Sequence, residues 1–404
     1  MATTRILLRA GKDPFQPLSA EETLARNVLG DNGGNALFSG AIHQLLSRAD
    51  TEVVADHWST QKPADQRMTV RDIAAINEEY DAFVLPMANA FRRGFTRNLR
   101  ALTRVIERLT IPVVVVGAGA QLPMDGPFVQ PDDEPDRHIV RFLRAVLDRS
   151  PAIGVRGEKT RAYLGSLGFG DEHVDVVGCP SLSAHTGPEV VKRVDSLDRS
   201  SRLALNLTPV VPGIGALVEH HVDAYDDLVY IAQTNATLGL LLGQGDDRAA
   251  ELDPRLPHSV DHPLFRAGQV RFYVDPTPWI DYLATRDFAF GTRLHGNVAA
   301  LEAGTPAVLL SIDSRTQELA DYHQIPHRRL THDLFETADA AELYAEADFT
   351  AFNARRTEIR DHLLAFLHRA GLETQDEADA AAYRQRLAAT QFAPAVVSGS
   401  SPER

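Results

Sequence analysis

"DFAFGTRLHGNVAALEAGTPAVLLS", which runs from Asp287 to Ser311, is the stretch that decides the fold. It begins with an apolar run typical of a buried strand and passes through a turn that has a glycine at each end. It then continues as a helix that leads into a second apolar strand. Strand, helix and strand in close succession form the unit of a parallel sheet covered by helices. The stretch therefore predicts an α/β fold and places Arg293 and His295 at the carboxyl end of a strand.

The same alternation extends over most of the 404 residues, a length that fits about two domains. We expect two Rossmann-like, doubly wound domains that face a cleft, one over residues 1–190 and one over residues 200–335, with a polar linker from His185 to Ser201. A helical segment (336–390) and a disordered tail (391–404) follow. In the first domain the predicted strands cover residues 5–10, 81–87, 111–119, 151–157 and 173–180. In the second they cover residues 202–207, 238–243, 269–274, 287–291 and 307–311, with a helix near 220–234.

The composition limits the classes of partner that we expect the protein to bind. The chain carries 41 Lys and Arg against 55 Asp and Glu, a net charge of −14. A negative field argues against nucleic acid or an anionic membrane as the main partner, although a local arginine cluster can still hold an anionic small substrate. The single cysteine, Cys179, cannot form an internal disulfide, and we interpret it as structural. Neither a signal peptide nor a membrane-spanning run is recognisable, so we expect a cytoplasmic protein without stable membrane insertion.

Ligands of open α/β sheets bind where the carboxyl ends of strands pass through glycine turns into helices. Arg293 can grip a carboxylate or phosphate bidentately, and the helix N-terminus beside it favours an anion. His295 can exchange a proton near neutral pH. The alternative is structural: Arg293 bonds nearby carbonyl groups and His295 is a satisfied core histidine. The loops selected by this rule are 30–35, 117–121, 155–159, 178–183, 291–297 and 311–315.

Two of these loops allow two interpretations each. Arg156 either pairs with its neighbour Glu158 or faces Arg293 across the cleft, so that two arginines hold the two anionic ends of one ligand. The glycine-rich run Gly30–Ile42 does not match the dinucleotide-binding fingerprint. It either cradles an anion or an acceptor sugar, or it is a tight turn with Asn35 as the N-cap of the next helix.

Three further groups of residues carry weaker signals. Asp313 in "SIDSRT" is better interpreted as a helix cap than as a lining residue of the cleft, and Arg315 follows it. His220 and His221 lie on an acidic amphipathic segment, and His323 and His327 flank a proline in an expected surface loop. None of these histidines has a metal-binding spacing, so we predict no metal site.

Taken in order, these blocks resemble the polysaccharide pyruvyl transferase family. The segment "DFAFGTRLHGNVAALEAGTPAVLLSIDSRTQELADYHQIP" is similar to its C-terminal signature. The runs "GDNGGNALFSGAI", "VVVVGAGAQ" and "IGVRGEKTRAYLGSLGF…VDVVGCPSL" are similar to its N-terminal blocks. The resemblance covers, in pieces, about Arg26 to Pro326, and it implies a fold like that of the GT-B glycosyltransferases.

The resemblance also implies a reaction. Pyruvate moves from phosphoenolpyruvate (PEP) to a sugar diol, which gives a cyclic ketal and phosphate without a metal or cofactor. The arginines that bind PEP correspond to Arg156 and Arg293, and the functional histidine to His295, as general acid or as phosphate ligand. The remaining residues expected to bind substrate are Asp31, Asn32, Gly33, Gly119, Gly296, Asn297, Asp313 and Arg315.

The partner implied is a saccharide or glycolipid acceptor of cell-envelope polysaccharide biosynthesis. We expect it on the side of the first domain and PEP on the side of the second. A lipid-linked acceptor would bring the protein to the membrane periphery. The sequence leaves open the acceptor, the ketal stereochemistry and the oligomeric state, a homo-oligomer included.

Two alternatives remain. A glycosyltransferase that uses a nucleotide sugar would need a glutamate five residues before Gly304, where Ala299 stands, whereas Glu302 lies only two residues before it. A non-catalytic family member is the other alternative. Its support is that the strand predicted over 238–243 ends in Gln244-Gly245-Asp246, where the resemblance implies a histidine.

Overall fold

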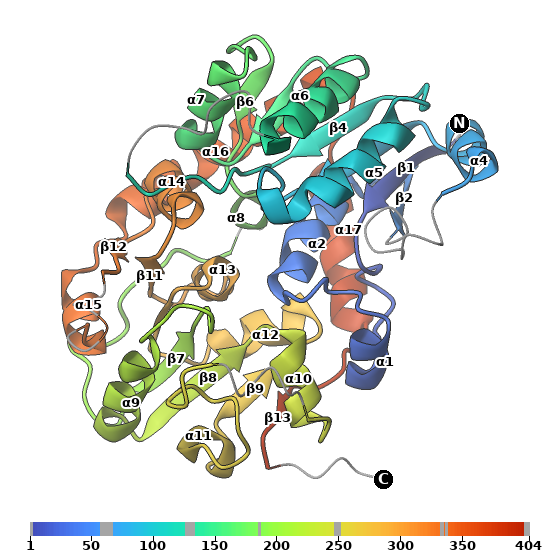
Figure 1. Cartoon of the computed structure of the whole chain (residues 1–404). Coiled ribbons are helices and arrows are strands. Elements are labelled where there is room, and N and C mark those ends of the chain that lie inside the picture. The colour runs from blue at the N-terminus through green and yellow to red at the C-terminus, as the bar shows by residue number, and fades with distance from the viewer. Residues whose placement is uncertain are drawn as a thin grey trace.

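The computed structural model describes residues 3–56, 68–125, 134–184, 187–245, 252–331, 335 and 338–399. Two α/β lobes lie one above the other in Figure 1, each built on a parallel sheet with helices on its faces. The prediction of two Rossmann-like domains is therefore confirmed. Strands such as Val113–Val116 are buried on both faces, and this explains why they read as unbroken apolar runs.

The N-terminal lobe contains a four-stranded parallel sheet of order β2-β1-β3-β4, and a parallel bridge between Ala118 and Val155 joins it to the pair β5-β6. The strands are β1 (Thr4–Arg9), β2 (Thr51–Asp56), β3 (Ala82–Pro86), β4 (Val113–Val116), β5 (Ile153–Val155) and β6 (Val174–Val176). The helices are α1 (Ala20–Ala25), α2 (Gly34–Leu46), α4 (Val70–Glu79), α5 (Thr96–Ile106), α6 (Glu134–Leu147), α7 (Glu158–Ser166) and α8 (Pro180–Ala184), with a 3₁₀ turn at Arg93–Phe95.

The C-terminal lobe contains a seven-stranded sheet of order β12-β11-β10-β7-β8-β9-β13. Its strands are β7 (Arg202–Asn206), β8 (Asp227–Ala232), β9 (Val270–Phe272), β10 (Phe288–Gly291), β11 (Ala307–Ser311), β12 (His327–Arg329) and β13 (Val396–Val397). Its helices are α9 (Gly215–Ala224), α10 (Asn235–Leu241), α11 (Pro263–Arg266), α12 (Pro276–Leu283), α13 (Leu294–Glu302), α14 (Ser314–His323) and α15 (Ala340–Glu346).

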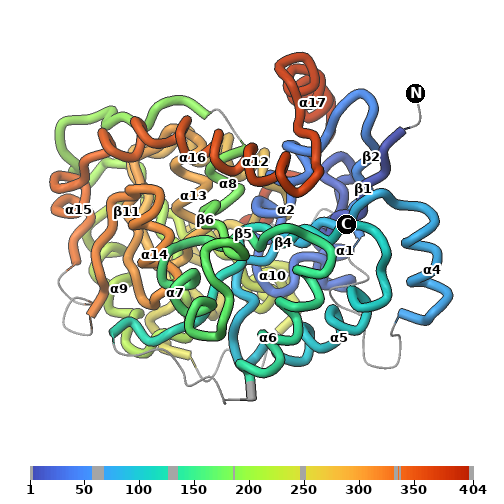
Figure 2. Tube along the Cα trace, turned by 90° about the horizontal axis from the view of Figure 1, so that it is seen from above, coloured from blue at the N-terminus to red at the C-terminus, as the bar shows by residue number. Residues whose placement is uncertain are grey.

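The last part of the chain returns to both lobes. Helices α16 (Thr350–Arg369) and α17 (Glu377–Ala389) confirm the helical character of 336–390. Leu363 and Phe366 of α16 pack in one core cluster with Ile6 and Leu8 of β1, and Figure 2 shows α17 beside the blue N-terminal elements. The helical segment therefore completes the N-terminal core, although the chain reaches it last.

The prediction of a disordered tail is wrong for residues 391–399. Strand β13 pairs antiparallel with β9, with Val396 opposite Phe272, and the hydroxyl of Ser398 accepts a hydrogen bond from the Val270 amide at 3.2 Å. A two-residue edge strand is too short to show any periodicity, so only its pairing reveals it. Residues 400–404 lie outside the described residues.

Two sequence predictions near residue 230 are also wrong. The sequence predicts a strand over 238–243, but this run lies in α10 and the turn after it, and the strand of this region is β8, inside the segment predicted as a helix. "DLVYIA" is a short strand that is buried from Leu228 to Ala232, and such a run has no period-2 alternation to separate it from a helix. The residue that follows the strand is therefore Gln233 and not Gln244, and Asp246 lies outside the described residues.

The expected surface loop around Pro326 is wrong as well. His323 closes α14 and is 4% exposed, and its Nε2 accepts a hydrogen bond from the Cys179 amide at 2.9 Å. His327 begins β12. In the segment interpreted as the linker, residues 187–201 contain no helix or strand, and His185 and Thr186 lie outside the described residues. Within the described ranges, no helix combines the length and the apolar character that a membrane span requires.

Candidate active site

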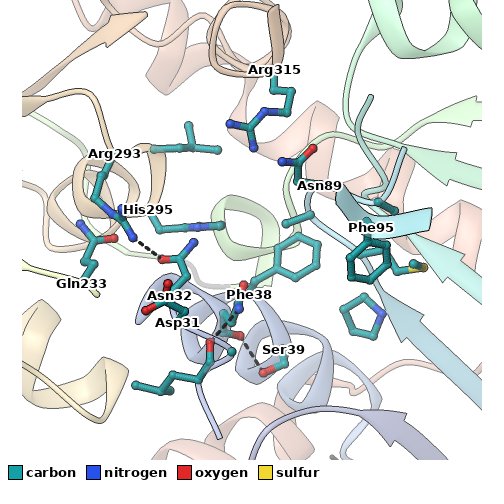
Figure 3. A pocket seen from close by; sticks show the side chains of 18 of the residues that line it. Asp31, Asn32, Phe38, Ser39, Asn89, Phe95, Gln233, Arg293, His295 and Arg315 are labelled. Carbon is teal, nitrogen blue, oxygen red and sulfur yellow. Dashed lines mark hydrogen bonds between the residues drawn. The ribbon is translucent and has the colours of Figure 1, made fainter. Parts of the chain in front are cut away.

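A cavity of about 520 Å³ lies between the two lobes, at the carboxyl ends of both sheets. In each sheet it sits where the strand order reverses, beside β1 and β3 in one lobe and beside β7 and β10 in the other. Ligands bind at such reversal points because the connecting loops diverge there and leave a crevice. Figure 3 shows side chains from both lobes pointing into this space.

His295 lies in the first turn of α13 and is 5% exposed. Its Nε2 is buried without a hydrogen-bond partner among the described residues. Burial lowers the pKa of His295 to about 3, and the positive charges of Arg156, Arg293 and Arg315 add to this effect. These cations disfavour the protonated ring, and an anion that enters the cavity would offset this effect.

Arg293 is the N-cap residue of α13, and two asparagines fix its turn. Its amide donates to Asn206 Oδ1 at 3.1 Å, and the Asn297 side chain donates to the backbone oxygens of Gly291 and Arg293 at 3.0 and 3.2 Å. The Arg293 guanidinium lies 3.4 Å from Asn32 Oδ1, a contact drawn as a dashed line between these two labelled residues in Figure 3. Burial lowers the pKa of Arg293, which still leaves a guanidinium charged near neutral pH.

Arg156 reaches the same cavity from the loop after β5. It is 2% exposed, and its side chain makes one long hydrogen bond, from Nη2 to the Gly117 oxygen at 3.4 Å, while its Nε has no partner among the described residues. The alternative in which it pairs with Glu158 is wrong, because the Glu158 carboxylate contacts Arg161 at 2.7 Å. Burial lowers the pKa of Arg156. The structure thus brings Arg156, Arg293 and His295 around one cavity.

The substrate-binding candidates divide into two groups. Asp31, Asn32 and Arg315 line the cavity. The others stand behind its wall and shape it: Gly296 leaves room for Asn206, Gly119 leaves room for the Arg156 side chain, and Asp313 caps α14. Gly33 is the N-cap of α2, so the alternative with Asn35 as N-cap is wrong. The candidates that do not line the cavity themselves are Gly33, Gly119, Gly296, Asn297 and Asp313.

Sequence reasoning missed several polar residues that line the cavity, among them Arg9, Asn89, Arg92 and Gln233. Arg9 ends β1, and Asn89 follows β3, so the strand-end rule applied to these two strands would have found them. Gln233 follows β8. The sequence prediction missed it because it placed the strand of this region at 238–243. Gln233 is 3% exposed, and neither its amide nitrogen nor its oxygen has a partner in the described part of the chain.

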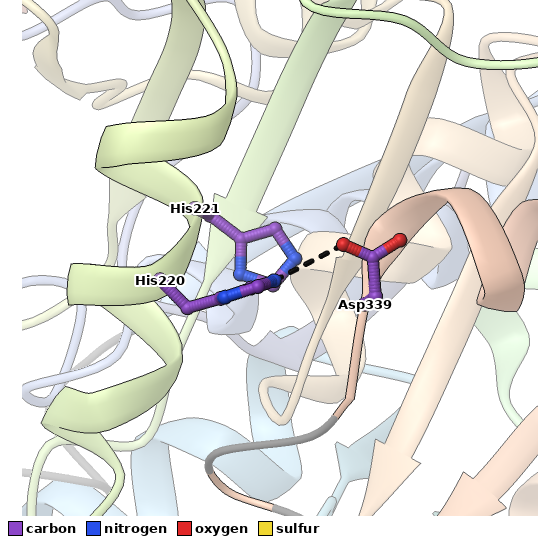
Figure 4. Close-up of side chains that lie close together, drawn as sticks. All are labelled: His220, His221 and Asp339. Carbon is purple, nitrogen blue, oxygen red and sulfur yellow. Dashed lines mark hydrogen bonds and ion pairs between the residues drawn. The ribbon is translucent and has the colours of Figure 1, made fainter.

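His220, His221 and Asp339 approach one another in the C-terminal lobe (Figure 4), and their ligand atoms lie within 4.8 Å. His221 Nδ1 lies 2.7 Å from the Leu217 oxygen, and its Nε2 accepts the Ala340 amide at 3.1 Å. Both ring nitrogens are therefore engaged with the backbone. Since a metal ligand needs a lone pair that is not already in use, we interpret this group as structural.

Comparison with known proteins agrees with the geometry. Residues 32–314, which include Arg156, Arg293 and His295, match the sequence pattern of the family described as polysaccharide pyruvyl transferase. The chain belongs to the polysaccharide pyruvyl transferase family. Its two Rossmann-like lobes form the GT-B-like arrangement that the resemblance implied.

Other matches are distant. The chain is 12% identical to S. aureus MnaA, solved with UDP, covering 91% of this chain and 98% of that one at a TM-score of 0.42. It is 11% identical to Methanocaldococcus jannaschii UDP-GlcNAc 2-epimerase, solved with UDP-GlcNAc and UDP, covering 91% of this chain and 100% of that one at a TM-score of 0.45. Such weak likenesses say nothing about what this chain binds. No curated protein matches it significantly.

Proposed function

We propose that this family member transfers the pyruvyl group of PEP to a diol of a saccharide acceptor and forms a cyclic ketal. The observation that carries the proposal is the convergence of Arg156, Arg293 and Arg315 on the unpartnered Nε2 of His295. PEP bears a carboxylate and a phosphate, together about three negative charges when fully ionised. The guanidinium groups of Arg156 and Arg293 come from opposite lobes and can bind both ends of the molecule, and Arg315, which is ion-paired with Asp313 at 2.5 Å, adds a third guanidinium group.

His295 can act on PEP as a general acid or as a phosphate ligand. We favour the general acid, which transfers a proton to the methylene carbon. Before PEP binds, the low pKa of His295 keeps the ring neutral. Anionic PEP offsets the arginine charges, so the pKa of His295 rises when PEP binds. The imidazolium then protonates C3 of PEP, which makes C2 electrophilic. As a phosphate ligand, the same ring would instead donate a hydrogen bond without giving up its proton.

The remaining steps balance without any further reagent. One sugar hydroxyl attacks C2, the C2–O bond to phosphate breaks, and the second hydroxyl closes the ring at C2. Of the two hydroxyl protons, one replaces the proton that His295 delivered and the other leaves with phosphate. Gln233, with both amide atoms unpartnered beside Arg293 in Figure 3, is suited to hydrogen-bond an acceptor hydroxyl.

The nucleotide-sugar alternative finds no support in the position of Glu302. This residue is 3% exposed at the far end of α13, and its carboxylate faces Arg356 at 3.4 Å, outside the cavity lining. Ala299 is buried on the same helix. No carboxylate on α13 is thus available to hold a ribose.

The test is calorimetric binding of PEP to the parent protein, to Arg293→Gln and to the control Arg266→Gln. Arg266 is an exposed arginine of the same lobe that does not line the cavity, so its replacement changes the net charge equally. We expect Arg293→Gln to weaken PEP binding about 100-fold or more, because a bidentate charged pair is lost. The control stays within about twofold of the parent.

A UDP-sugar is titrated in parallel. The proposal is wrong if PEP fails to bind the parent protein while the UDP-sugar binds and is lost in Arg293→Gln. The same experiment therefore separates a PEP-dependent transferase from a glycosyltransferase.

A further inference from the structure

The exposed surface of helices α5 and α6 consists almost entirely of arginine. In α5 the exposed residues are Ala101 and three arginines, and within residues 135–147 of α6 every exposed residue is an arginine. We call these six residues the arginine face: Arg97, Arg100, Arg104, Arg137, Arg141 and Arg144. Since the whole chain has a net charge of −14, its average composition does not explain this concentration of positive charge.

The arginine face is one continuous surface. Its members recur every three or four residues along each helix, which places them in a stripe on one side. The opposite sides of the helices pack in the core, through residues such as Leu99 and Phe142. Figures 1 and 2 show α5 and α6 side by side, and Arg141 donates two hydrogen bonds to the Glu107 carboxylate at 2.8 and 2.9 Å. The two stripes therefore lie next to each other.

Most of the charge of the arginine face is not compensated by carboxylates. Arg141 pairs with Glu107, whereas the other five arginines of the face form no ion pair with any carboxylate in the described ranges. The helix α4 borders α5, because the Asn77 side chain donates to the Arg108 oxygen at 3.1 Å. This helix exposes Glu78 and Glu79. The cationic surface is thus bounded by acidic residues on that side.

The arginine face starts at the edge of the cavity between the lobes. Phe95 and Asn98 line the cavity, and Arg97 lies between them in the sequence with its side chain exposed. From Arg97 to Arg104 an arginine recurs about every 5 Å along α5. This spacing is similar to the length of one sugar residue in an extended chain. The cavity of about 520 Å³ has room for PEP and the reacting end of a saccharide, so the rest of a polymeric acceptor lies outside it.

We infer that the arginine face binds the acceptor chain outside the cavity, and that the acceptor is an acidic polysaccharide whose sugars carry carboxylates or other anionic groups. Guanidinium groups bind such groups through charge-assisted hydrogen bonds, whereas a neutral chain would gain little from them. This inference rests on the proposed function, which places the reacting sugar of a saccharide acceptor in the cavity.

An anionic membrane fits the arginine face less well. A helix that lies in a membrane interface exposes large apolar side chains beside its basic ones, whereas α5 and α6 turn theirs toward the core. Charges interact over about 10 Å at 0.1 M salt, so a flat anionic surface would also come within reach of the acidic residues that border the face. A single polymer strand can follow the arginines alone.

The first experiment titrates polygalacturonate into the protein without PEP, with its methyl ester as a neutral polymer of the same backbone. We expect the parent protein to bind polygalacturonate at least about tenfold more tightly than the ester, and this binding to weaken as the salt concentration rises. The face variant replaces three exposed arginines that do not line the cavity: Arg97→Gln, Arg100→Gln and Arg144→Gln. It should bind polygalacturonate about tenfold more weakly, while its dissociation constant for PEP changes less than about twofold.

The matched control variant removes three exposed arginines from other surfaces: Arg199→Gln, Arg266→Gln and Arg384→Gln. Because it loses the same net charge, it should bind polygalacturonate within about twofold of the parent protein. Turnover gives a second measurement, with a polysaccharide mixture that supports phosphate release from PEP by the parent protein. The face variant should need about tenfold more of this mixture for its half-maximal rate, at an unchanged kcat.

Four outcomes overturn the inference. The methyl ester binds as tightly as polygalacturonate, the two variants weaken polygalacturonate binding equally, the face variant loses PEP binding as well, or phosphatidylglycerol vesicles bind more tightly than polygalacturonate and only the face variant loses them. The last result would assign the face to a membrane. Failure of PEP to bind the parent protein would instead overturn the proposed function, and the two failures are distinguishable because polygalacturonate is titrated without PEP.

Discussion

His221 and His295 are both buried histidines of the C-terminal lobe, and burial lowers the pKa of both, to about 4 and about 3. Their surroundings differ. The two ring nitrogens of His221 are bonded to the backbone, whereas His295 leaves Nε2 unpartnered beside three arginines. Burial and a shifted pKa therefore do not separate a structural histidine from a functional one. Unmet hydrogen bonds and uncompensated charge distinguish the functional histidine from the structural one.

The largest expected effect is the loss of turnover in His295→Gln. If this ring protonates PEP, phosphate release from PEP should fall about 100- to 10,000-fold, the usual contribution of a general acid. The measurement uses an acceptor mixture that supports turnover of the parent protein. Calorimetry of the same variant should show PEP still bound. If turnover is retained, His295 has only a structural role, like His221.

Gly34→Ala should lower turnover although it replaces no catalytic residue. A Cβ at Gly34 would stand 2.4 Å from His295 Nδ1, so the ring must move, and displacement of a catalytic group by about 1 Å can cost about 100-fold in turnover.

Gly40→Ala is the matched control for this substitution. It lies on the same helix with nothing within 4 Å of an added Cβ. It should leave turnover unchanged and raise stability by up to about 1 kcal/mol. Equal turnover in the two alanine variants would contradict a precisely held His295.

His221→Phe should lower the stability of the protein and leave PEP binding unchanged. An aromatic ring is kept, but the Ala340 amide loses its acceptor, at a cost of about 1–3 kcal/mol in the free energy of unfolding. Urea denaturation measures this loss. PEP binding by the folded protein should equal that of the parent, and a large drop in affinity would show that this region is coupled to the site.

The smallest effect is proton uptake on PEP binding. His295 is neutral before PEP binds, since its pKa is about 3, and the bound anion raises that pKa. Binding should therefore take up as much as about one proton and become tighter as the pH falls toward the raised pKa. Calorimetry in two buffers of different ionisation enthalpy measures the uptake. His295→Gln is the control for protons taken up by PEP itself, and identical uptake in the variant would refute the linkage.

Local sequence determined a large part of this protein. Strand, glycine turn and helix follow one another so closely at Arg156 and at Arg293 that the rule of strand ends selects both residues from the chain's local pattern alone. The rule fails where that pattern is ambiguous. The buried strand β8 has no alternation, so Gln233 is not recognised, and β13 is too short to show a period.

The tertiary structure alone decided which residues share the cavity. Arg9, Arg156 and Arg293 lie far apart in the chain, and they meet because both sheets reverse their strand order at the same crevice. The sequence determined which residues stand at strand ends, because period and turn chemistry are local properties. Which of them face one another, and which charges stay uncompensated, depends on how the two sheets pack. That packing is set by long-range burial, including helices that return from the end of the chain.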